Sequence, residues 1–241
     1  MLTYGTLRIF IDEKIEAISA FGSILSGIGT FFAAYAAIYI FNGWKVQANF
    51  DLKKEHVNQL SILLSMAYDE VHRISEILID LNNIETHEVI CENFIEINAN
   101  DLRVEFYKNI INAKMLDRLN TKNKEVFSHY AKYQIHLFYL VKYFNNIQNQ
   151  YTEYYVNHIS SMPMAQKDDF RKNGYFIKYK RTRSKSDIEK KLTSLISHKV
   201  IFTGNNKKYV YNNITEMTKE MEEIYSKLEK IVLDSINLKL N

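Results

Sequence analysis

Three stretches of the chain carry apolar residues at alternating spacings of four and three, the heptad pattern of helices that pack on one another. The stripe of the first stretch is Phe50, Val57, Leu60, Leu64, Ala67, Val71, Ile74, Leu78 and Leu81, with Lys53 at the stripe position between Phe50 and Val57. The second is Val126, Tyr130, Tyr133, Leu137, Leu140, Phe144, Ile147, Tyr151, Tyr154 and His158. The third is Ile214, Met217, Met221, Ile224, Leu228, Ile231, Ser235 and Leu238, behind the candidate N-cap Asn213. Three such helices predict a mainly α-helical, antiparallel bundle, with an intermolecular coiled coil as the alternative.

Shorter elements are expected between and after these helices. The spacing of apolar residues predicts helices at about 89–97 and 102–119. From 160 to 185 the pattern breaks around Pro163 and Gly174, which indicates an exposed loop, within which residues 175–179 could form a strand.

The C-terminal third carries two local signals. Ser186 and Glu189 have the spacing of a capping box and predict a short helix. Residues 200–202 and 209–211 flank a turn that contains Gly204, and together they predict a small β-hairpin.

Upstream of the heptad helices, no charged residue occurs between Glu16 and Lys45. As a helix, residues 17–41 would extend about 37 Å, enough to cross the hydrocarbon core of a bilayer. Ten strongly apolar side chains favour insertion by on the order of 3 to 6 kcal/mol. Two tyrosines and Trp44 gather at the C-terminal end of the stretch, which would lie at the headgroup level that aromatic rings favour. We therefore predict one transmembrane helix at 17–41 that continues into the first bundle helix, with Gly43 as the candidate break.

Two other interpretations of this stretch remain open. A signal peptide would be cut near Ala34 to Ala36, although three acids precede the stretch and apolar residues continue past the cut. A buried core helix would have to stay uncharged over an unusual length. Cations flank the two ends almost equally, with a slight excess on the C-terminal side. The positive-inside rule therefore favours a cytoplasmic C-terminal domain on a single-pass protein of the bacterial inner membrane.

Small residues recur at helical spacing within the predicted span. Gly22, Ser26, Gly29 and Ala33 would share one face of the helix. Because such a face lets a second helix approach closely, we interpret it as a candidate oligomerisation surface. The alternative is that these residues face lipid and have no role.

Together the patterns divide the chain into five parts. These are a short tail at 1–16, the transmembrane helix at 17–41, a helical bundle core at 45–159, a basic loop at 160–185, and a part at 186–241 with a short helix, the hairpin and the last helix. Seven glycines and one proline in 241 residues favour long helices. Cys91 is the only cysteine, so no internal disulfide can form, as is typical of a reducing compartment.

Positive charge is concentrated between Lys167 and Lys191. Ten lysines and arginines against four acids give this segment a charge of +6, whereas the whole chain carries +3. The candidate binding side chains are Tyr175, Lys178, Tyr179, Lys180, Arg181, Arg183 and Lys185. Because cations can meet phosphates while aromatic rings stack on bases, a membrane-associated nucleic-acid-binding protein is the alternative function. Anionic lipid headgroups and a merely solvated loop are the other interpretations.

Neither catalysis nor a cofactor is expected. The cluster around His87 and Cys91 offers metal-ligand side chains, but no second pair stands at a spacing typical of a metal site. The sequence also lacks a phosphate-binding glycine loop, a His-Glu-x2-His motif and a Gly-x-Ser-x-Gly elbow.

The single N-terminal span, the sequence Trp44-Lys45-x-Gln47 and the aromatic run from His129 to Phe144 together resemble phage abortive-infection membrane proteins of bacteria. The resemblance covers the larger, N-terminal part of the chain, which departs from it in having only one clear span. It implies a defence protein that senses infection in the cytoplasm and acts at the membrane, and it assigns no functional residue. We therefore expect a membrane-anchored helical sensor or effector that self-associates through its transmembrane and heptad helices and can engage another protein.

Overall fold

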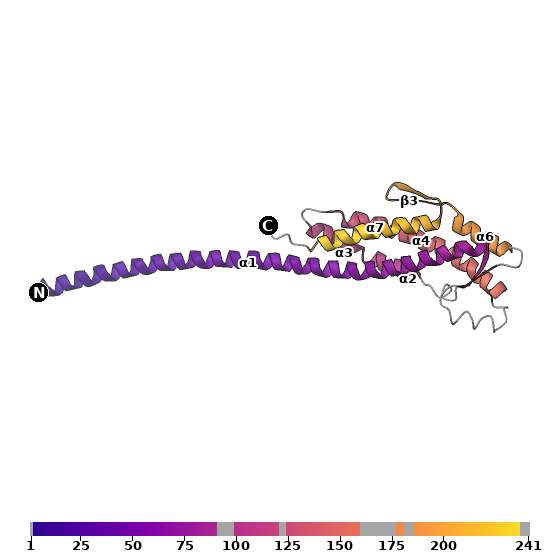
Figure 1. The fold of residues 1–241 in the computed structure, drawn as a ribbon. Helices are drawn as coiled ribbons and strands as arrows, with labels where there is room; N and C mark the ends of the chain where they lie inside the picture. Colours follow the sequence, from indigo (N-terminus) through magenta and orange to yellow (C-terminus); the bar gives the residue numbers. More distant parts are fainter. Residues whose placement is uncertain (1, 91–98, 121–123, 160–176, 181–185, 237–241) are drawn as a thin grey trace. The chain divides into compact units, whose positions relative to one another are not determined.

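The computed structural model describes residues 2–90, 99–120, 124–159, 177–180 and 186–236. The chain divides into two compact units, Met1–Leu52 and Lys53–Asn241. The first unit consists of the N-terminal part of helix α1 (Leu2–Leu81), and the second holds the rest of α1 and all other elements (Figure 1).

Helix α1 has no break at Gly43. A glycine in a helix costs only about 1 kcal/mol relative to alanine, which the hydrogen bonds of the flanking turns outweigh. The uncharged stretch and the first heptad stripe therefore belong to one helix, as predicted. The same helix already begins at Leu2, upstream of the predicted span.

The other elements of the second unit follow in chain order. They are the 3-10 turn Asn82–Glu85, β1 (His87–Ile90), α2 (Ala99–Lys108), α3 (Ile110–Leu119), α4 (Val126–Tyr154) with a π-helical turn at Tyr155–Ile159, β2 (Ile177–Lys180), α6 (Asp187–Ser197), β3 (Val200–Gly204), β4 (Lys207–Tyr211) and α7 (Ile214–Asp234).

Side-chain contacts fix the directions of the bundle helices. Helices α2 and α3 run antiparallel to α4, because Arg103 lies over the ring of Phe138 while Asp117 accepts a hydrogen bond from the backbone nitrogen of Val126, near the start of α4. Helix α7 lies beside α4 in the opposite direction (Figure 1).

Helix α7 is also antiparallel to the bundle part of α1. The hydroxyl groups of Ser75 and Thr218 lie 3.1 Å apart, and the rings of Tyr68 and Tyr225 lie 4.8 Å apart. A later residue of α1 therefore contacts an earlier residue of α7, so the two helices run in opposite directions. An antiparallel bundle is thus formed by α1, by α2 followed by α3, by α4 and by α7, which confirms the prediction.

The core of the bundle is rich in aromatic residues. On α4, the nine stripe positions from Val126 to Tyr154 are at most 1% exposed. Full burial of each large apolar side chain stabilises the fold by about 1.5–3 kcal/mol. Buried tyrosines retain hydrogen bonds, as the hydroxyl of Tyr130 donates to the carbonyl of Phe106 at 2.5 Å. On α7 the stripe ends differently, because Val232 rather than Ile231 is fully buried.

The expected helix at 89–97 is wrong at its start, because Val89 and Ile90 belong to strand β1. This strand pairs antiparallel with β2, and Val89 stands opposite Lys178. β-Branched residues suit a strand that has a partner, and this partner comes from the expected basic loop. Within that loop, residues 177–180 form the strand, close to the predicted 175–179, whose first two residues lie outside the described part of the chain.

The expected helix at 102–119 is two helices. Asn109 separates α2 from α3, and its side-chain nitrogen donates to the carbonyl of Glu105 at 3.0 Å. Asparagine side chains compete with the backbone for hydrogen bonds, which favours such an interruption.

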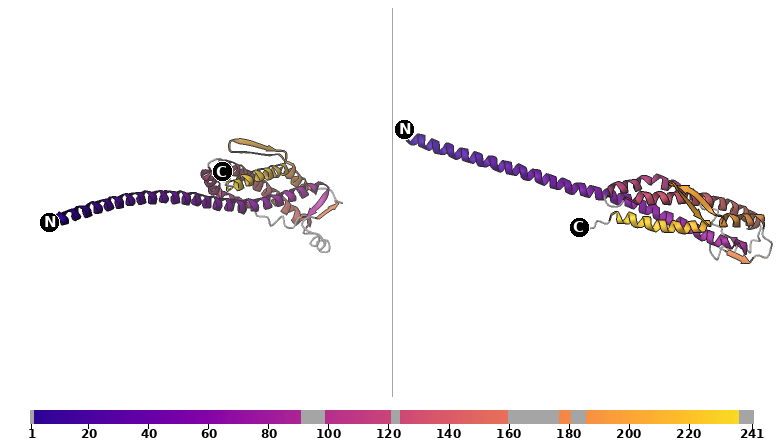
Figure 2. Two further views of the ribbon diagram at one scale, coloured as in Figure 1. Left: turned by 60° about the vertical axis from the view of Figure 1, so that its left-hand side comes forward. Right: turned by 90° about the horizontal axis from the view of Figure 1, so that it is seen from above.

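The hairpin and both predicted helix caps are confirmed. Strands β3 and β4 are joined by Asn205 and Asn206, whose φ values of 49° and 60° fit a type I′ turn. The hairpin packs against α4 and α7 (Figure 2). At Gly204 an added Cβ would lie 2.6 Å from Cγ2 of Ile135, so only glycine allows this approach to α4. At the start of α7, the side chain of Asn213 accepts a hydrogen bond from the backbone nitrogen of Glu216 at 2.8 Å.

Candidate functional site

The most distinctive surface of the first unit is the apolar stretch of α1. Every described side chain from Ile18 to Tyr35 is exposed, with Phe31 at 82% and Phe32 at 73%. Soluble proteins rarely leave so long a contiguous apolar surface uncovered, because its contact with water costs free energy in proportion to area. Among the described residues, one helix is long and apolar enough to cross a membrane, and it is α1. A signal sequence near the N-terminus would share these features.

Two polar side chains within the stretch bond to the backbone of the helix itself. The hydroxyl of Ser23 donates to the carbonyl of Ser19 at 3.0 Å, and the hydroxyl of Thr30 donates to the carbonyl of Ser26 at 2.9 Å. An unbonded hydroxyl costs several kcal/mol in an apolar medium, on the order of 2 to 7. These bonds reduce that cost, so the stretch suits an apolar environment better than its serine and threonine content indicates.

The predicted oligomerisation residues lie on this exposed helix. Gly22, Ser26, Gly29 and Ala33 recur every three or four positions, and a Cβ added at either glycine would meet nothing within 4 Å. The sequence pattern therefore places a narrow, open strip of small side chains along the helix.

The C-terminal end of the stretch changes from apolar to polar within a few residues. The rings of Phe41 and Trp44 are 6.3 Å apart, and Trp44 remains 66% exposed. One turn further on, Gln47 donates to the carboxylate of Asp51 at 3.1 Å. An exposed aromatic pair followed by charged residues is the arrangement that favours the interface between a bilayer and water.

The predicted basic site is brought together only in part. The backbones of Lys178, Tyr179 and Lys180 lie in β2, opposite Val89, Glu88 and His87. Tyr175, Arg181, Arg183 and Lys185 lie outside the described residues. The β1–β2 pairing thus anchors one stretch of the basic segment to the end of the bundle.

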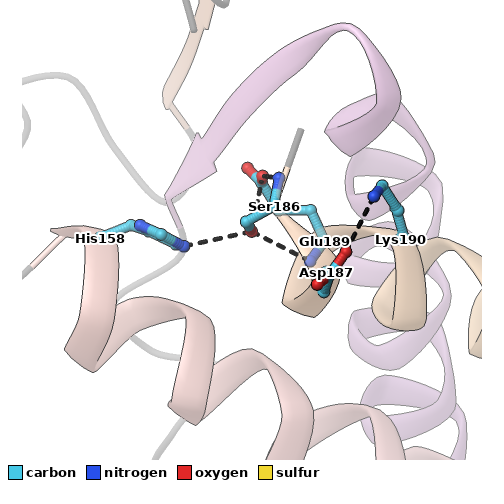
Figure 3. Close-up of polar contacts among 5 residues, drawn as sticks. All are labelled: His158, Ser186, Asp187, Glu189 and Lys190. Carbon is cyan, nitrogen blue, oxygen red and sulfur yellow. Dashed lines mark hydrogen bonds and ion pairs between the residues drawn. The ribbon is translucent and has the colours of Figure 1, made fainter. Parts of the chain in front are cut away.

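A contact between His158 and Ser186 was not predicted and has the superficial form of a nucleophile with its base. Nε2 of His158 lies 3.2 Å from Oγ of Ser186 (Figure 3). The hydroxyl, however, donates to the carboxylate of Glu189 at 2.9 Å and accepts from the backbone nitrogen of Glu189. The Glu189 carboxylate also accepts from the backbone nitrogen of Ser186 at 2.7 Å.

This geometry is that of a helix cap. In a catalytic pair the serine hydroxyl donates its hydrogen bond to the histidine. Here the hydroxyl of Ser186 donates to the carboxylate of Glu189 instead, and His158 contacts only its oxygen. The predicted capping box of α6 is therefore confirmed, and His158 ties it to the end of α4. The buried charge of Glu189 is compensated by its two hydrogen bonds from Ser186.

His136 is the fully buried histidine of the bundle. Its Nδ1 lies 2.7 Å from the carbonyl oxygen of Lys132, and its Nε2 lies 2.7 Å from the hydroxyl of Tyr211. Nδ1 donates to the carbonyl, which can only accept. Because burial also lowers the pKa of His136, the imidazole is neutral and Nε2 accepts from the tyrosine. Burial lowers the pKa of His136, against an opposing contribution from the hydrogen bond to Lys132. The ring packs edge-on against Phe202 and Tyr209, so the residue serves packing.

Among the described residues, no group of three His, Cys, Asp or Glu side chains is placed to hold a metal ion. The cluster around His87 is described only in part, since Cys91 falls outside those residues. Comparison of the chain with protein-family models, with curated proteins and with solved structures finds no match.

Proposed function

We propose that this protein is a single-pass membrane protein whose α1 stretch crosses the bacterial inner membrane and whose helical bundle lies in the cytoplasm. One observation carries the proposal: between Glu16 and Lys45 the chain has no charged residue, and the large apolar side chains of this stretch are exposed. In a bilayer these side chains would meet lipid tails instead of water.

The proposed role is that of an interaction protein, a sensor or effector that works as a homo-oligomer. The narrow face of Gly22, Ser26, Gly29 and Ala33 supports close helix pairing within the membrane. The resemblance to phage abortive-infection membrane proteins supports a role in defence, in which the bundle detects infection and α1 conveys the response to the membrane.

Membrane fractionation of the full-length protein tests the anchor. The wild-type protein should stay in the pellet after carbonate extraction. Ile24→Lys with Ile28→Lys should shift it to the soluble fraction, because each central lysine costs about 2.5–3.5 kcal/mol on insertion. Ile62 is also an exposed position of α1, at 65%, but lies in the second unit, so Ile62→Lys is the matched control and should stay in the pellet. Carbonate release of the wild-type protein would refute the anchor.

Crosslinking in membranes tests self-association. Gly22→Leu with Ser26→Leu should reduce the oligomer, because bulk on the small face separates the helices. Ala20→Leu with Gly27→Leu adds similar bulk on the opposite face of α1 and should leave the oligomer intact. Equal crosslinking of both double variants and the wild-type protein would rule out this face as the interface.

A further inference from the structure

The second unit carries a groove of about 590 Å³ between α2, α4 and β3. Helix α2 contributes Arg103, Val104 and Tyr107, helix α4 contributes Phe138 and Tyr139, and β3 contributes Thr203. The volume lies within the range of small-molecule sites, roughly 300–1,000 Å³. All lining residues belong to the second unit, so the groove is independent of the membrane stretch.

Aromatic rings form much of the groove wall. Tyr107 is 73% exposed and Phe138 is 42% exposed, so both present ring surface to an incoming ligand. Tyr139 is held from behind, because its ring stacks on Phe202 with the centroids 4.2 Å apart. The held ring of Tyr139 and the exposed rings of Tyr107 and Phe138 favour a flat aromatic ligand, which can stack on them.

The groove also holds a positive charge. The guanidinium of Arg103 lies 5.5 Å from the centroid of the Phe138 ring. Among the described residues, no carboxylate forms an ion pair with Arg103, and Glu105, two positions further on, is bound to Lys108 at 2.7 Å. A guanidinium held over a ring at the edge of an apolar groove is placed to receive a planar anion through two parallel hydrogen bonds.

Other polar side chains line the groove, and a second cation lies on the neighbouring strand. Thr203 and Gln134 supply a hydroxyl and an amide to the lining. Lys208 is the cross-strand partner of Thr203 and is exposed, so it adds a second cation on the same face of the hairpin. The groove therefore combines apolar walls with a positively charged edge.

We propose that this groove binds a small, flat aromatic monoanion, such as an aromatic carboxylate, with its ring against Tyr107 and Phe138 and its carboxylate on Arg103. The inference goes beyond the proposed membrane anchor and does not rest on it. If the protein is a sensor, such a compound would be a ligand of the cytoplasmic bundle.

Binding of 2-naphthoate to the full-length protein in lipid nanodiscs tests the proposal, with 2-naphthylmethanol as the uncharged probe and empty nanodiscs as the reference. The wild-type protein should bind 2-naphthoate saturably at one site per chain. Arg103→Gln should lower the affinity for 2-naphthoate by about tenfold, as expected for loss of a charge-assisted hydrogen bond. It should change the affinity for 2-naphthylmethanol by less than about twofold. Val104→Trp should abolish binding of both, because the indole fills the groove. Arg118→Gln removes an exposed arginine of α3 outside the groove and should change neither.

Hydroxyl-radical footprinting gives a second readout that needs no variant. On the wild-type protein, 2-naphthoate should protect Tyr107 but not Tyr68, which is exposed in the same unit outside the groove. Absence of saturable binding, unprotected Tyr107, or equal binding by Arg103→Gln, Val104→Trp and the wild-type protein would overturn the proposal. The proposal would also be overturned if 2-naphthoate fails to bind and Val104→Trp dissociates an oligomer of the protein. That result would mean that a second copy of the chain covers the groove.

Discussion

Nε2 of His136 on α4 accepts a hydrogen bond of 2.7 Å from the hydroxyl of Tyr211 on β4, and this contact joins the hairpin to the aromatic-rich helix of the bundle core. The two residues are 75 positions apart in the sequence. Because His136 is fully buried, the bond satisfies a nitrogen that water cannot reach.

Removal of this hydroxyl should destabilise the bundle. We expect Tyr211→Phe to lower the free energy of unfolding by about 1–3 kcal/mol, because it leaves the buried Nε2 without a donor. Tyr209→Phe is the matched control: the Tyr209 hydroxyl forms no hydrogen bond with the described residues, and its loss should cost less than about 0.5 kcal/mol. Chemical unfolding of the full-length protein in detergent, followed by circular dichroism, measures both. Equal stabilities would show that the His136–Tyr211 bond contributes nothing.

The same histidine predicts a pH dependence of stability. Burial lowers the pKa of His136 in the folded protein, so near pH 6 the unfolded chain binds more protons at this residue than the folded chain does. Its contribution to stability should therefore be complete above the unfolded pKa of about 6.5 and be lost as the pH falls below it. The measurement is the unfolding free energy of wild type and His136→Gln from about pH 5 to pH 8. The difference between them should shrink toward low pH, and a difference independent of pH would contradict the assignment.

The close approach of Gly204 to Ile135 allows a steric test of how the hairpin packs on α4. Gly204→Ala should destabilise the bundle by about 1–3 kcal/mol, because the new Cβ would overlap Cγ2 of Ile135, a branched side chain with little freedom to move. Ile135→Ala removes that overlap, so the double variant should be more stable than the sum of the two single effects predicts. Additive losses in thermal unfolding would mean that the hairpin shifts away from α4 instead.

The nucleic-acid alternative predicts a salt-dependent interaction through Lys178, Arg181 and Arg183. If it is correct, the full-length protein in neutral nanodiscs should retard single-stranded RNA at low salt. Replacing the three cations by glutamine should then reduce the slope of log affinity against log salt by about 2. Matched replacement of Lys219, Lys227 and Lys230, exposed lysines of α7, should leave the slope unchanged. A wild-type protein that retards no RNA removes this alternative.

Local patterns predicted those parts of the fold whose cause is local. The α4 stripe, the Ser186–Glu189 box and the hairpin around Gly204 each rest on residues within a few positions of one another, and each is confirmed. In these places the periodicity or the cap itself decides the structure.

Contacts between distant segments could not be predicted in the same way. Strand β1 needs a partner about 90 residues later, and the apolar residues Val89 and Ile90 alone fit a helix as well as a strand. The His136–Tyr211 bond and the groove around Arg103 arise only when the hairpin and α2 pack on α4. For the membrane stretch the sequence was sufficient to select the candidate, since length and lack of charge are its defining properties.

Cysteine accessibility in bacterial spheroplasts tests the membrane crossing most directly. In a Cys91→Ser background, Thr6→Cys and Lys199→Cys place single thiols before and after the stretch, to be labelled with a membrane-impermeant maleimide. A single-pass protein with a cytoplasmic bundle should be labelled at position 6 in intact spheroplasts and at position 199 only after lysis. Labelling of both positions on the same side, or loss of the N-terminal thiol from a shortened protein, would contradict a transmembrane α1.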